Sequence, residues 1–425
     1  MNILVIGGGG REHAIVSAIA KSEKTTKIYC APGNAGIAEL ATCVPIGVME
    51  FDKLVEFAKD NAIDLTVVGP DDPLVGGVVD AFEAAGLRVF GPRKNAAIIE
   101  GSKAFSKELM KKYGIPTAGY ETFSDAEEAA KYIVAQGKYP VVLKADGLAL
   151  GKGVLICNNE SEALAGVKEI MLDKHFGTAG DKMVVEEFMT GREVSALCFC
   201  DGKNVRPMTS AQDHKRAGDG DTGLNTGGMG TFSPSPFYTD EIHEFCVKNI
   251  YEPTMAAMAA EGRPFTGVMF VGLMLTPEGP KVLEYNARFG DPETQVVLPR
   301  MENDIVDVFE ACIDGRLDEV ELRFTDNAAV CVVLASEGYP QHYEKGLPIT
   351  GLDAFKGCDD KFVFHAGTKF GPDGEILTNG GRVLGVTALG ADLKEARANA
   401  YKATELISFA NKYMRHDIGK AIDEA

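Results

Sequence analysis

The chain has 425 residues, of which 45% are hydrophobic and 25% charged, and its formal net charge is −19 at pH 7. This length is enough for two to four domains, each with its own core, and the composition is that of a globular protein. The negative charge argues against nonspecific binding to nucleic acid or to an anionic membrane, so an anionic substrate needs a locally basic pocket.

The chain shows no sign of a membrane or export segment. It has no run of eighteen apolar residues, and Met1–Gly7 lacks a basic leader and reads as a buried first strand. The nine cysteines form no Cys-x-x-Cys pair, and Cys198 and Cys200 alternate within an apolar strand, which favours buried thiols over zinc or disulfides. This pattern fits a reducing cytoplasm. We expect a cytoplasmic protein that binds neither nucleic acid nor membrane, and the expectation of a monomer does not rest on these features.

Residues 1–101 alternate between apolar strands and amphipathic helices. This alternation is typical of a parallel, doubly wound α/β sheet, whose ligands bind at the carboxyl ends of the strands. The predicted strands are Asn2–Ile6, Lys27–Cys30, Leu65–Val68 and Arg88–Phe90, and the predicted helices are Glu12–Ala20, Phe51–Asp60 and Val75–Ala85.

A glycine loop, Gly7–Gly10, joins the first strand to the first helix, where backbone amides can hold an anion. It is not a dinucleotide fingerprint, because Glu12 or His13 replaces the third glycine and the second strand ends in Cys30–Gly33 without an acidic residue. NAD binding is therefore disfavoured. The loop either binds a substrate phosphate with the help of Arg11 or is only a tight turn, and His13 is expected to be structural.

Residues 123–191 are predicted to form a small α+β lid inserted in a larger domain. Ser124 is a plausible helix N-cap, with Glu127 completing a capping box. A glycine hairpin follows Lys144; it lacks the spacing of a Walker A motif but can fold over a triphosphate, and Lys103 offers a second cation. Each lysine alone also fits an ordinary surface charge. The predicted elements are helices Ser102–Lys112 and Ser161–Met171, an extended segment Thr117–Phe123, and strands Val141–Lys144, Gly153–Cys157 and Lys182–Glu186, with loop Ala145–Lys152.

The remaining chain combines strands, helices and one long irregular stretch. Asp213–Phe237 shows no periodicity and carries six glycines, which predicts a functional loop. Residues 328–425 begin a last α/β unit. The predicted strands are Glu193–Phe199, Val205–Met208, Thr266–Leu275, Lys281–Tyr285, Ala328–Leu334 and Arg382–Leu389, and the predicted helices are Asp240–Ala260, Ile305–Asp314 and Leu393–Asn411.

The strand Lys281–Tyr285 carries the most informative polar residues. Glu284 and Asn286 project from one face of the pleat, and Arg288 follows in the same phase. A carboxylate, an amide and a guanidinium in this register suit a magnesium ion and the phosphates it bridges. The alternative is a sheet-edge salt bridge between Glu284 and Arg288.

These residues resemble the ATP-grasp ligases and, within them, the phosphoribosylamine–glycine ligase family. The likeness covers essentially the whole chain, and its most specific block is Arg288–Gln295. The motifs that carry it are Lys103, Lys144 with its hairpin, Glu186–Met189, Glu193, Glu284-x-Asn286-x-Arg288, Ile6–Ala14, Ala31–Gly36, Val68–Pro70, Gln212–Arg216, Asn225–Gly230, Arg288–Gln295 and His365–Thr368.

The resemblance implies an enzyme of purine synthesis. It would join glycine to 5-phosphoribosylamine through a glycyl phosphate, consuming ATP and giving glycinamide ribonucleotide, ADP and phosphate. It also implies a Rossmann-like N-terminal domain (1–101), an ATP-grasp domain (102–327) with the inserted lid (123–191), and a C-terminal α/β domain (328–425). Two alternatives stay open: a ligase for another amine, and a nucleotide-binding regulatory module without catalysis.

The resemblance also implies roles for single residues. Glu284 and Asn286 would hold Mg²⁺ or Mn²⁺. The preceding strand, Phe270–Met274, lacks the carboxylate found in many ATP-grasp enzymes, so a second magnesium would have fewer protein ligands, and phosphate oxygens and water would complete its shell. Whether Asp291 or Glu293 touches substrate stays open. The implied ATP site is Lys103, Lys144, Glu186, Glu187, Phe188, Met189 and Glu193; the implied substrate site is Gly8, Gly9, Gly10, Arg11, Asp213, Lys215, Arg288 and Asp291; the implied catalytic residues are Lys144, Arg288 and Asp291.

Overall fold

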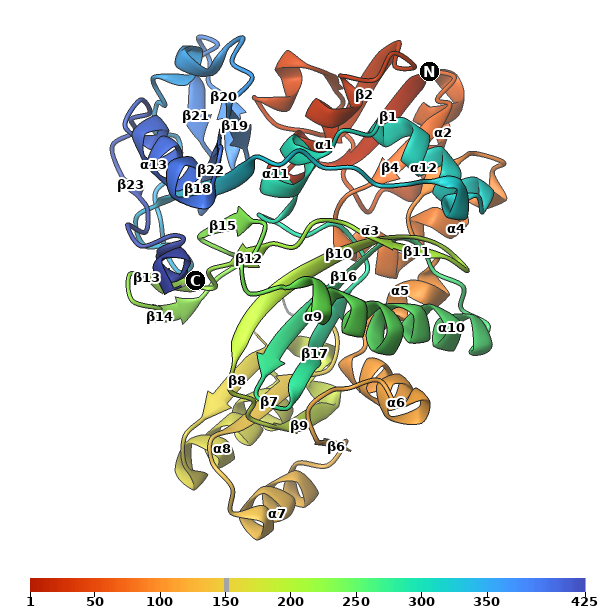
Figure 1. Cartoon of the computed structure of the whole chain (residues 1–425), viewed down its shortest axis with the longest axis vertical. Helices are drawn as coiled ribbons and strands as arrows, with labels where there is room; N and C mark the ends of the chain where they lie inside the picture. The colour runs from red at the N-terminus through yellow and green to blue at the C-terminus, as the bar shows by residue number, and fades with distance from the viewer. Residues whose placement is uncertain (149–152, 425) are drawn as a thin grey trace.

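The structure is a computed structural model that describes residues 1–148 and 153–424. It is built around four main sheets (Figure 1). An N-terminal sheet and a C-terminal sheet lie side by side at one end of the molecule, a central sheet lies below them, and a small subdomain projects at the opposite end. None of the described helices is long and apolar enough to cross a membrane.

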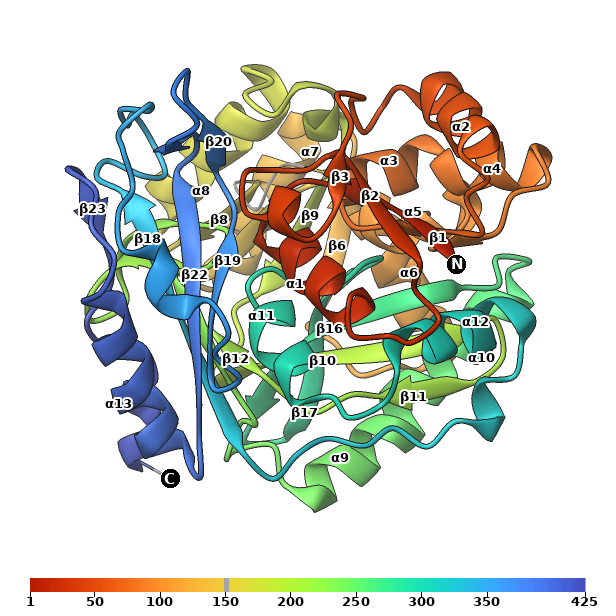
Figure 2. The same ribbon diagram turned by 90° about the horizontal axis from the view of Figure 1, so that it is seen from above.

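The N-terminal sheet has five parallel strands in the order β3-β2-β1-β4-β5. Helices cover it, which explains why its central strands are continuous apolar runs, and α1 packs against α11 and β19 (Figure 2). The predicted doubly wound sheet is confirmed. The elements are β1 (Asn2–Gly7), α1 (Gly10–Ile19), β2 (Lys27–Pro32), β3 (Thr42–Cys43), α2 (Phe51–Asp60), β4 (Leu65–Val68), α3 (Asp71–Gly76), α4 (Val78–Ala84), β5 (Val89–Phe90) and α5 (Lys94–Gly101).

One helix prediction in this region was wrong, and one helix was not predicted. The single helix expected over Val75–Ala85 is interrupted at Gly77, whose φ of 101° is in the left-handed region that favours glycine. Helix α5 was not predicted. It follows the turn Gly91-Pro92 at once, and this turn hides its start in the sequence.

The lid has an antiparallel sheet in the order β6-β9-β7-β8 and an apolar core of its own. The predicted hairpin is confirmed, since Val141 pairs with Cys157; residues 149–152 of its loop lie outside the described residues. The helix cap is one residue later than predicted, because Asp125 rather than Ser124 accepts the amide of Glu128. The elements are β6 (Tyr120–Phe123), α7 (Ala126–Gln136), β7 (Val141–Ala145), β8 (Val154–Cys157), α8 (Glu160–Val167), which continues as a π-helical turn over Lys168–Leu172, and β9 (Met183–Glu187).

The central sheet is antiparallel in the order β11-β10-β16-β17. Its long strands, β10 and β16, are buried along most of their length. The elements are α6 (Lys103–Tyr113), β10 (Arg192–Asp201), β11 (Val205–Pro207), α9 (Asp240–Cys246) and α10 (Glu252–Ala260) with the π-helical turn Val247–Tyr251 between them, β16 (Thr266–Thr276), β17 (Gly279–Asn286), α11 (Thr294–Val297) and α12 (Ile305–Asp314).

The C-terminal sheet has the order β12-β15-β18-β22-β19, with β23 beside β18. The stretch Asp213–Phe237 is therefore not the irregular loop that was predicted: β15 pairs with β18, and β13 and β14 form a hairpin. Strands of two to four residues are too short for a detectable period. The elements are β12 (Gln212–Asp213), β13 (Arg216–Gly218), β14 (Thr222–Asn225), β15 (Gly230–Ser233), β18 (Ala328–Ser336), β19 (Lys361–His365), β20 (Thr368–Phe370), β21 (Ile376–Thr378), β22 (Arg382–Gly390), α13 (Leu393–Thr404), which ends earlier than predicted, and β23 (Lys412–Tyr413).

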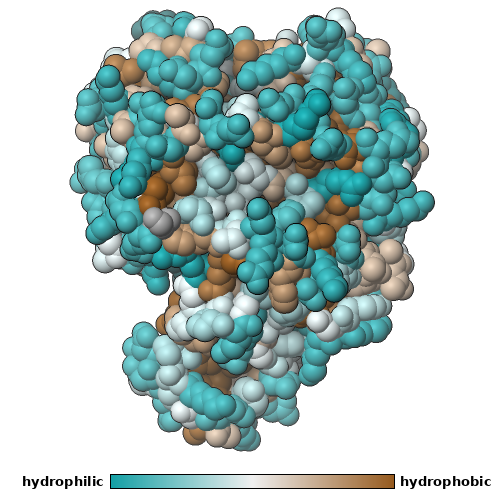
Figure 3. All heavy atoms as spheres, viewed as in Figure 1, coloured by the Kyte–Doolittle hydropathy of each residue, from teal (hydrophilic) through white to brown (hydrophobic). Residues whose placement is uncertain are grey.

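The length of the chain predicted a separate core for each domain, but the N-terminal and central sheets share a core. One buried cluster contains Leu4 together with Met269, and the ring of Phe90 lies 4.3 Å from that of Phe309, centroid to centroid. The lid, by contrast, packs on its own core and stands clear of the body in the space-filling view, with a notch between the two (Figure 3). The shared core fixes the N-terminal strand ends relative to β17.

Candidate active site

Two metal-type oxygen ligands lie side by side on β17. Glu284 pairs across the sheet with Gly272, and Asn286 with Phe270, so both project from the same face. Gly272 leaves room for the carboxylate, because a Cβ there would lie 3.3 Å from Glu284 Cγ. Within the described residues, neither the Glu284 carboxylate nor Asn286 Oδ1 accepts a hydrogen bond. These oxygens are therefore available to a cation.

Glu100, at the end of α5, binds the polar residues that leave β17. Its Oε1 accepts Asn286 Nδ2 at 3.0 Å and lies 3.0 Å from Arg288 Nη2, while its Oε2 accepts the amide of Ala287 at 2.6 Å. Glu100 is 6% exposed. Arg288 thus pairs with Glu100 rather than with Glu284, which corrects the alternative of a Glu284–Arg288 salt bridge. Nothing in the local spacing pointed to Glu100.

A buried carboxylate holds two lysines at the root of the lid. Glu186 Oε2 lies 3.0 Å from both Lys144 Nζ and Lys107 Nζ. All three side chains are almost completely buried, so Lys144 is not the surface charge that the sequence left open. Lys144 Nζ also donates to the carbonyl of Leu283 on β17, and Lys103 Nζ donates to that of Gly147 in the lid.

Lys107 was missed by the sequence analysis. It lies on α6 one turn after Lys103, and in a helix of mixed polarity it reads as a solvated lysine. Burial lowers its pKa to about 8, against the opposing effect of Glu186. Burial also lowers the pKa of Lys103, although Glu284 opposes this shift.

The strand that leaves the lid leads past an apolar patch into the central sheet. Met189 is buried with Ala118 and Met274 in this patch, while Glu187 and Phe188 are exposed. Glu193 lies exposed near the start of β10. Of the predicted adenine neighbours, the structure therefore places only Met189 in an apolar environment.

The glycine loop is tightly held. The amide of Gly9 donates to Glu12 Oε2 at 2.6 Å, and Arg11 Nε lies 2.6 Å from Glu12 Oε1. Arg11 is 9% exposed, and a Cβ at Gly10 would lie 2.7 Å from the side-chain nitrogen of Gln295. Glu12 thus already satisfies two groups predicted to bind phosphate, and an incoming phosphate must share or displace it.

Asp291 joins the central and C-terminal sheets. Its Oδ2 lies 3.1 Å from Arg382 Nη2, and its Oδ1 accepts Gln295 Nε2 at 2.7 Å. Burial alone would raise the pKa of Asp291, but Arg382 and Arg11 outweigh it and the pKa is lowered. Arg382 also donates to the carbonyls of Gly227 and Gly228. No local pattern in the sequence marks Arg382, which belongs to the C-terminal strand β22.

One lysine lies between two carboxylates beside Asp291. Lys215 Nζ is 2.6 Å from Asp213 Oδ2 and 3.9 Å from Glu293 Oε1, and Ser195 Oγ donates to the same Glu293 oxygen at 2.9 Å. Glu293 is 1% exposed, and burial raises its pKa, with Lys215 opposing and Asp213 adding to the shift. The two carboxylates of Asp213 and Glu293 outnumber the single lysine between them, which leaves an excess of negative charge around Lys215.

His13 links the N-terminal and C-terminal sheets, which fits the structural role predicted for it. Its Nδ1 accepts the backbone amide of His365 at 2.8 Å, and both rings are buried. Burial lowers the pKa of His13 to about 3 and that of His365 to about 4.

Acidification is expected to weaken this link. Since both folded pKa values lie below the usual 6.5, the stability they contribute is complete above pH 6.5 and is lost as pH falls toward 4. The free energy of unfolding should fall by about 1.4 kcal/mol per pH unit for each histidine. Urea titrations between pH 7 and 5 check this: His13→Gln, which keeps an acceptor, should show a shallower slope than the parent, and an unchanged slope would contradict the assignment.

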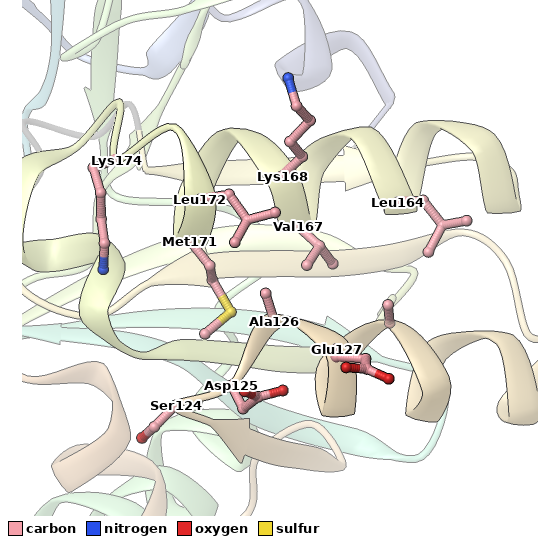
Figure 4. Close-up of a pocket in the computed structure, with 11 residues that line it drawn as sticks. Ser124, Asp125, Ala126, Glu127, Leu164, Val167, Lys168, Met171, Leu172 and Lys174 are labelled. Atoms are coloured by element: carbon pink, nitrogen blue, oxygen red, sulfur yellow. The ribbon is translucent and has the colours of Figure 1, made fainter.

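A hollow of about 500 Å³ in the lid is not this site. It lies between α7 and α8 and is lined by Ala126, Val167, Met171 and Leu172, among others (Figure 4). None of the charged residues assigned above to the candidate site lines it. The candidate site is instead the region where β17, the root of the lid and the N-terminal loop meet.

Comparison with known families gives a consistent result over the chain. Three domain models of phosphoribosylglycinamide synthetase match: the N domain at residues 1–100, the ATP-grasp (A) domain at 101–294 and the C domain at 329–421. A phosphoribosylamine–glycine ligase of Halalkalibacterium halodurans is 51% identical over 100% of this chain and 98% of its own. One of Caldanaerobacter subterraneus is 50% identical over 98% and 99%.

Solved structures agree in fold. The crystal structure of a phosphoribosylamine–glycine ligase from Thermotoga maritima superposes with a TM-score of 0.84 at 36% identity, over 99% of this chain and 100% of that one. The biotin carboxylase domain of a Hydrogenobacter thermophilus 2-oxoglutarate carboxylase has a TM-score of 0.74 at 18% identity, over 97% and 91%, and shares the fold alone. The chain therefore belongs to the phosphoribosylglycinamide synthetase family, with an ATP-grasp central domain.

Proposed function

We propose that this protein joins glycine to 5-phosphoribosylamine at the expense of ATP, giving glycinamide ribonucleotide, ADP and phosphate. The observation that carries the proposal is that Glu284 and Asn286 on β17, and Arg288 just after it, lie near the buried Lys144 of the lid, which donates to Leu283 of the same strand. The full-length relatives named phosphoribosylamine–glycine ligase support this choice of substrates. The protein would act in the cytoplasm as a monomer.

The cleft between lid and central sheet is the proposed ATP site. Lys144 and Lys103 neutralise the phosphates, Met189 offers an apolar surface to the adenine, and Glu193 accepts from the ribose hydroxyls. Glu186 holds Lys144 in place, while Glu187 and Phe188 border the base from the exposed side. A lid built on its own core is suited to closing over a triphosphate without disturbing the body.

The donor set on β17 fits Mg²⁺, and Mn²⁺ as an alternative. The Glu284 carboxylate and Asn286 Oδ1 are hard oxygen ligands, and no described residue donates a hydrogen bond to them. They would hold the ion together with phosphate oxygens and water. Such an ion neutralises charge on the phosphates when bound.

The reaction has two steps that need positioning more than covalent catalysis. A glycine carboxylate oxygen attacks the γ-phosphorus of ATP, the bond to the bridging oxygen breaks, and ADP leaves. The nitrogen of 5-phosphoribosylamine then attacks the glycyl carbonyl carbon, the bond to phosphate breaks, and the nitrogen loses a proton. Arg288 stabilises the phosphoryl group in transfer.

The two substrates to be joined are proposed to meet near Asp291. The negative cluster of Asp213, Lys215 and Glu293 suits an ammonium or amine group, and Gly8–Gly10 at the start of α1 suits the 5-phosphate with Arg11. Asp291 is held by Arg382 and Gln295, which orient its carboxylate.

ADP release by the purified protein tests the proposal. We expect release to require both glycine and freshly prepared 5-phosphoribosylamine, and glycinamide ribonucleotide to accumulate in equal amount. Turnover with another carboxylate and amine, but not with this pair, would instead support a ligase of different specificity. Binding of ATP without turnover of any such pair would support a regulatory module.

A further inference from the structure

We propose that Glu100 is a positioning residue that determines which atom of the Asn286 amide faces the metal. The inference rests on the proposed function, in which Asn286 binds Mg²⁺. Glu100 lies on α5, the helix that follows the last strand of the N-terminal sheet, and is therefore remote in sequence from the ligand that it orients.

The argument begins with the asymmetry of an amide side chain. Only its oxygen binds Mg²⁺, whereas its nitrogen only donates, and rotation by half a turn exchanges the two. An ionised carboxylate only accepts. Because Glu100 Oε1 lies 3.0 Å from Asn286 Nδ2, the nitrogen is held toward Glu100 and Oδ1 is turned away from it.

Glu100 is itself firmly placed. It is 6% exposed, and its second oxygen accepts the backbone amide of Ala287 at 2.6 Å, directly after Asn286. The oxygen that binds Asn286 also lies 3.0 Å from Arg288 Nη2. Three donors thus converge on one buried carboxylate. An ionised Glu100 has no proton to donate, so it accepts from all three.

Glu100 contacts two groups of the proposed ATP site and lies close in sequence to a third. Arg288, which faces the transferring phosphoryl group, shares an oxygen of Glu100 with the metal ligand. Ser102, two residues after Glu100, caps α6, and Lys103 is the first residue of that helix. Groups that orient a metal ligand usually change metal affinity by about 10- to 100-fold when removed.

Glu100→Gln is the informative substitution. The new amide presents a donor as well as an acceptor, so it cannot accept from Asn286, Ala287 and Arg288 together. Asn286 is then free to turn its nitrogen toward the metal. We expect the affinity for Mn²⁺ in the presence of saturating ADP, measured by electron paramagnetic resonance, to fall by about 10- to 100-fold.

The effect of Glu100→Gln should be measured both in the parent protein and in an Asn286→Asp variant, because the comparison tests whether Glu100 acts by orienting the amide. A carboxylate at position 286 presents an oxygen to the metal whichever way it is turned, so its orientation no longer matters. In that background the carboxylate at position 286 also faces Glu100, and the two like charges repel each other, so we expect Glu100→Gln to leave Mn²⁺ affinity unchanged or to raise it. An equal loss in both backgrounds would overturn the proposal, because it would show that Glu100 acts only through the general structure.

Asp201→Asn is the matched control for fold. Asp201 is also a buried carboxylate that holds a backbone turn, accepting the amides of Lys203, Asn204 and Leu317, but it lies outside the proposed site. It should lower the melting temperature without changing Mn²⁺ affinity. The resonance experiment does not use glycine or 5-phosphoribosylamine, so failure of the proposed ligase activity would be seen separately, as absence of product from the parent protein.

Discussion

Glu284→Gln is expected to abolish ligation, lowering kcat on the order of 10³-fold, equivalent to about 4 kcal/mol of transition-state stabilisation. The substitution keeps the volume of the side chain and removes the only charge of the proposed ligand pair. Since Gly272 lies opposite and no described residue donates to this carboxylate, the protein should fold as before. Steady-state rates of ADP release and melting temperatures together check this.

A glutamate in the turn of the same hairpin provides the control. Glu278 is exposed and pairs with Lys281. Glu278→Gln should keep full activity. Retention of most activity by Glu284→Gln, with an unchanged requirement for Mg²⁺, would rule out Glu284 as a metal ligand and leave the ligase proposal to rest on the relatives alone.

Glu186→Gln is expected to destabilise the protein by about 3–5 kcal/mol, because it leaves Lys107 and Lys144 buried without a compensating carboxylate. Urea unfolding at pH 7 measures the loss. Glu187→Gln, at the next and exposed position, should change the free energy of unfolding by less than about 0.5 kcal/mol.

The deficit should also depend on pH. The folded pKa of Lys107 is already lowered to about 8, and removal of Glu186 takes away the charge that opposes this shift. A lysine whose folded pKa lies below its unfolded value of 10.5 binds fewer protons in the folded state, so stability rises as pH increases between these values. The difference between Glu186→Gln and the parent should thus shrink between pH 7 and 9; a constant difference would contradict the role given to the buried lysines.

The site combines groups from parts of the chain whose relative positions are fixed to different degrees. Strand β1, which leads into the glycine loop, shares one buried cluster with β17 and a second with α11, and this packing holds Gly10 close to Gln295. Lys144 and Glu186 belong to the lid, whose core is separate. Polar links between lid and body at the site include the bonds from Lys144 to Leu283 and from Lys103 to Gly147 and the ion pair of Glu186 with Lys107.

Local patterns in the sequence predicted most of the elements. The alternation of strands and helices in residues 1–101 predicted the parallel sheet, and the period of two placed Glu284 and Asn286 on one face of β17. The glycine hairpin after Lys144 was predicted in the same way. These predictions succeed because strand pleat, helix period and turn residues are properties of a few consecutive residues.

Only the tertiary structure decided which side chains face each other across the site. The contacts that hold the site join residues far apart in the chain, as in the pairs Glu100–Asn286, Lys107–Glu186 and Arg382–Asp291. Strand β15 likewise pairs with β18, a strand distant in the sequence. Partners of this kind depend on how whole faces pack, which no local spacing records. By itself the sequence determined the elements and the β17 ligand pair of this protein; the packing of its cores determined the buried charges that hold that pair in place.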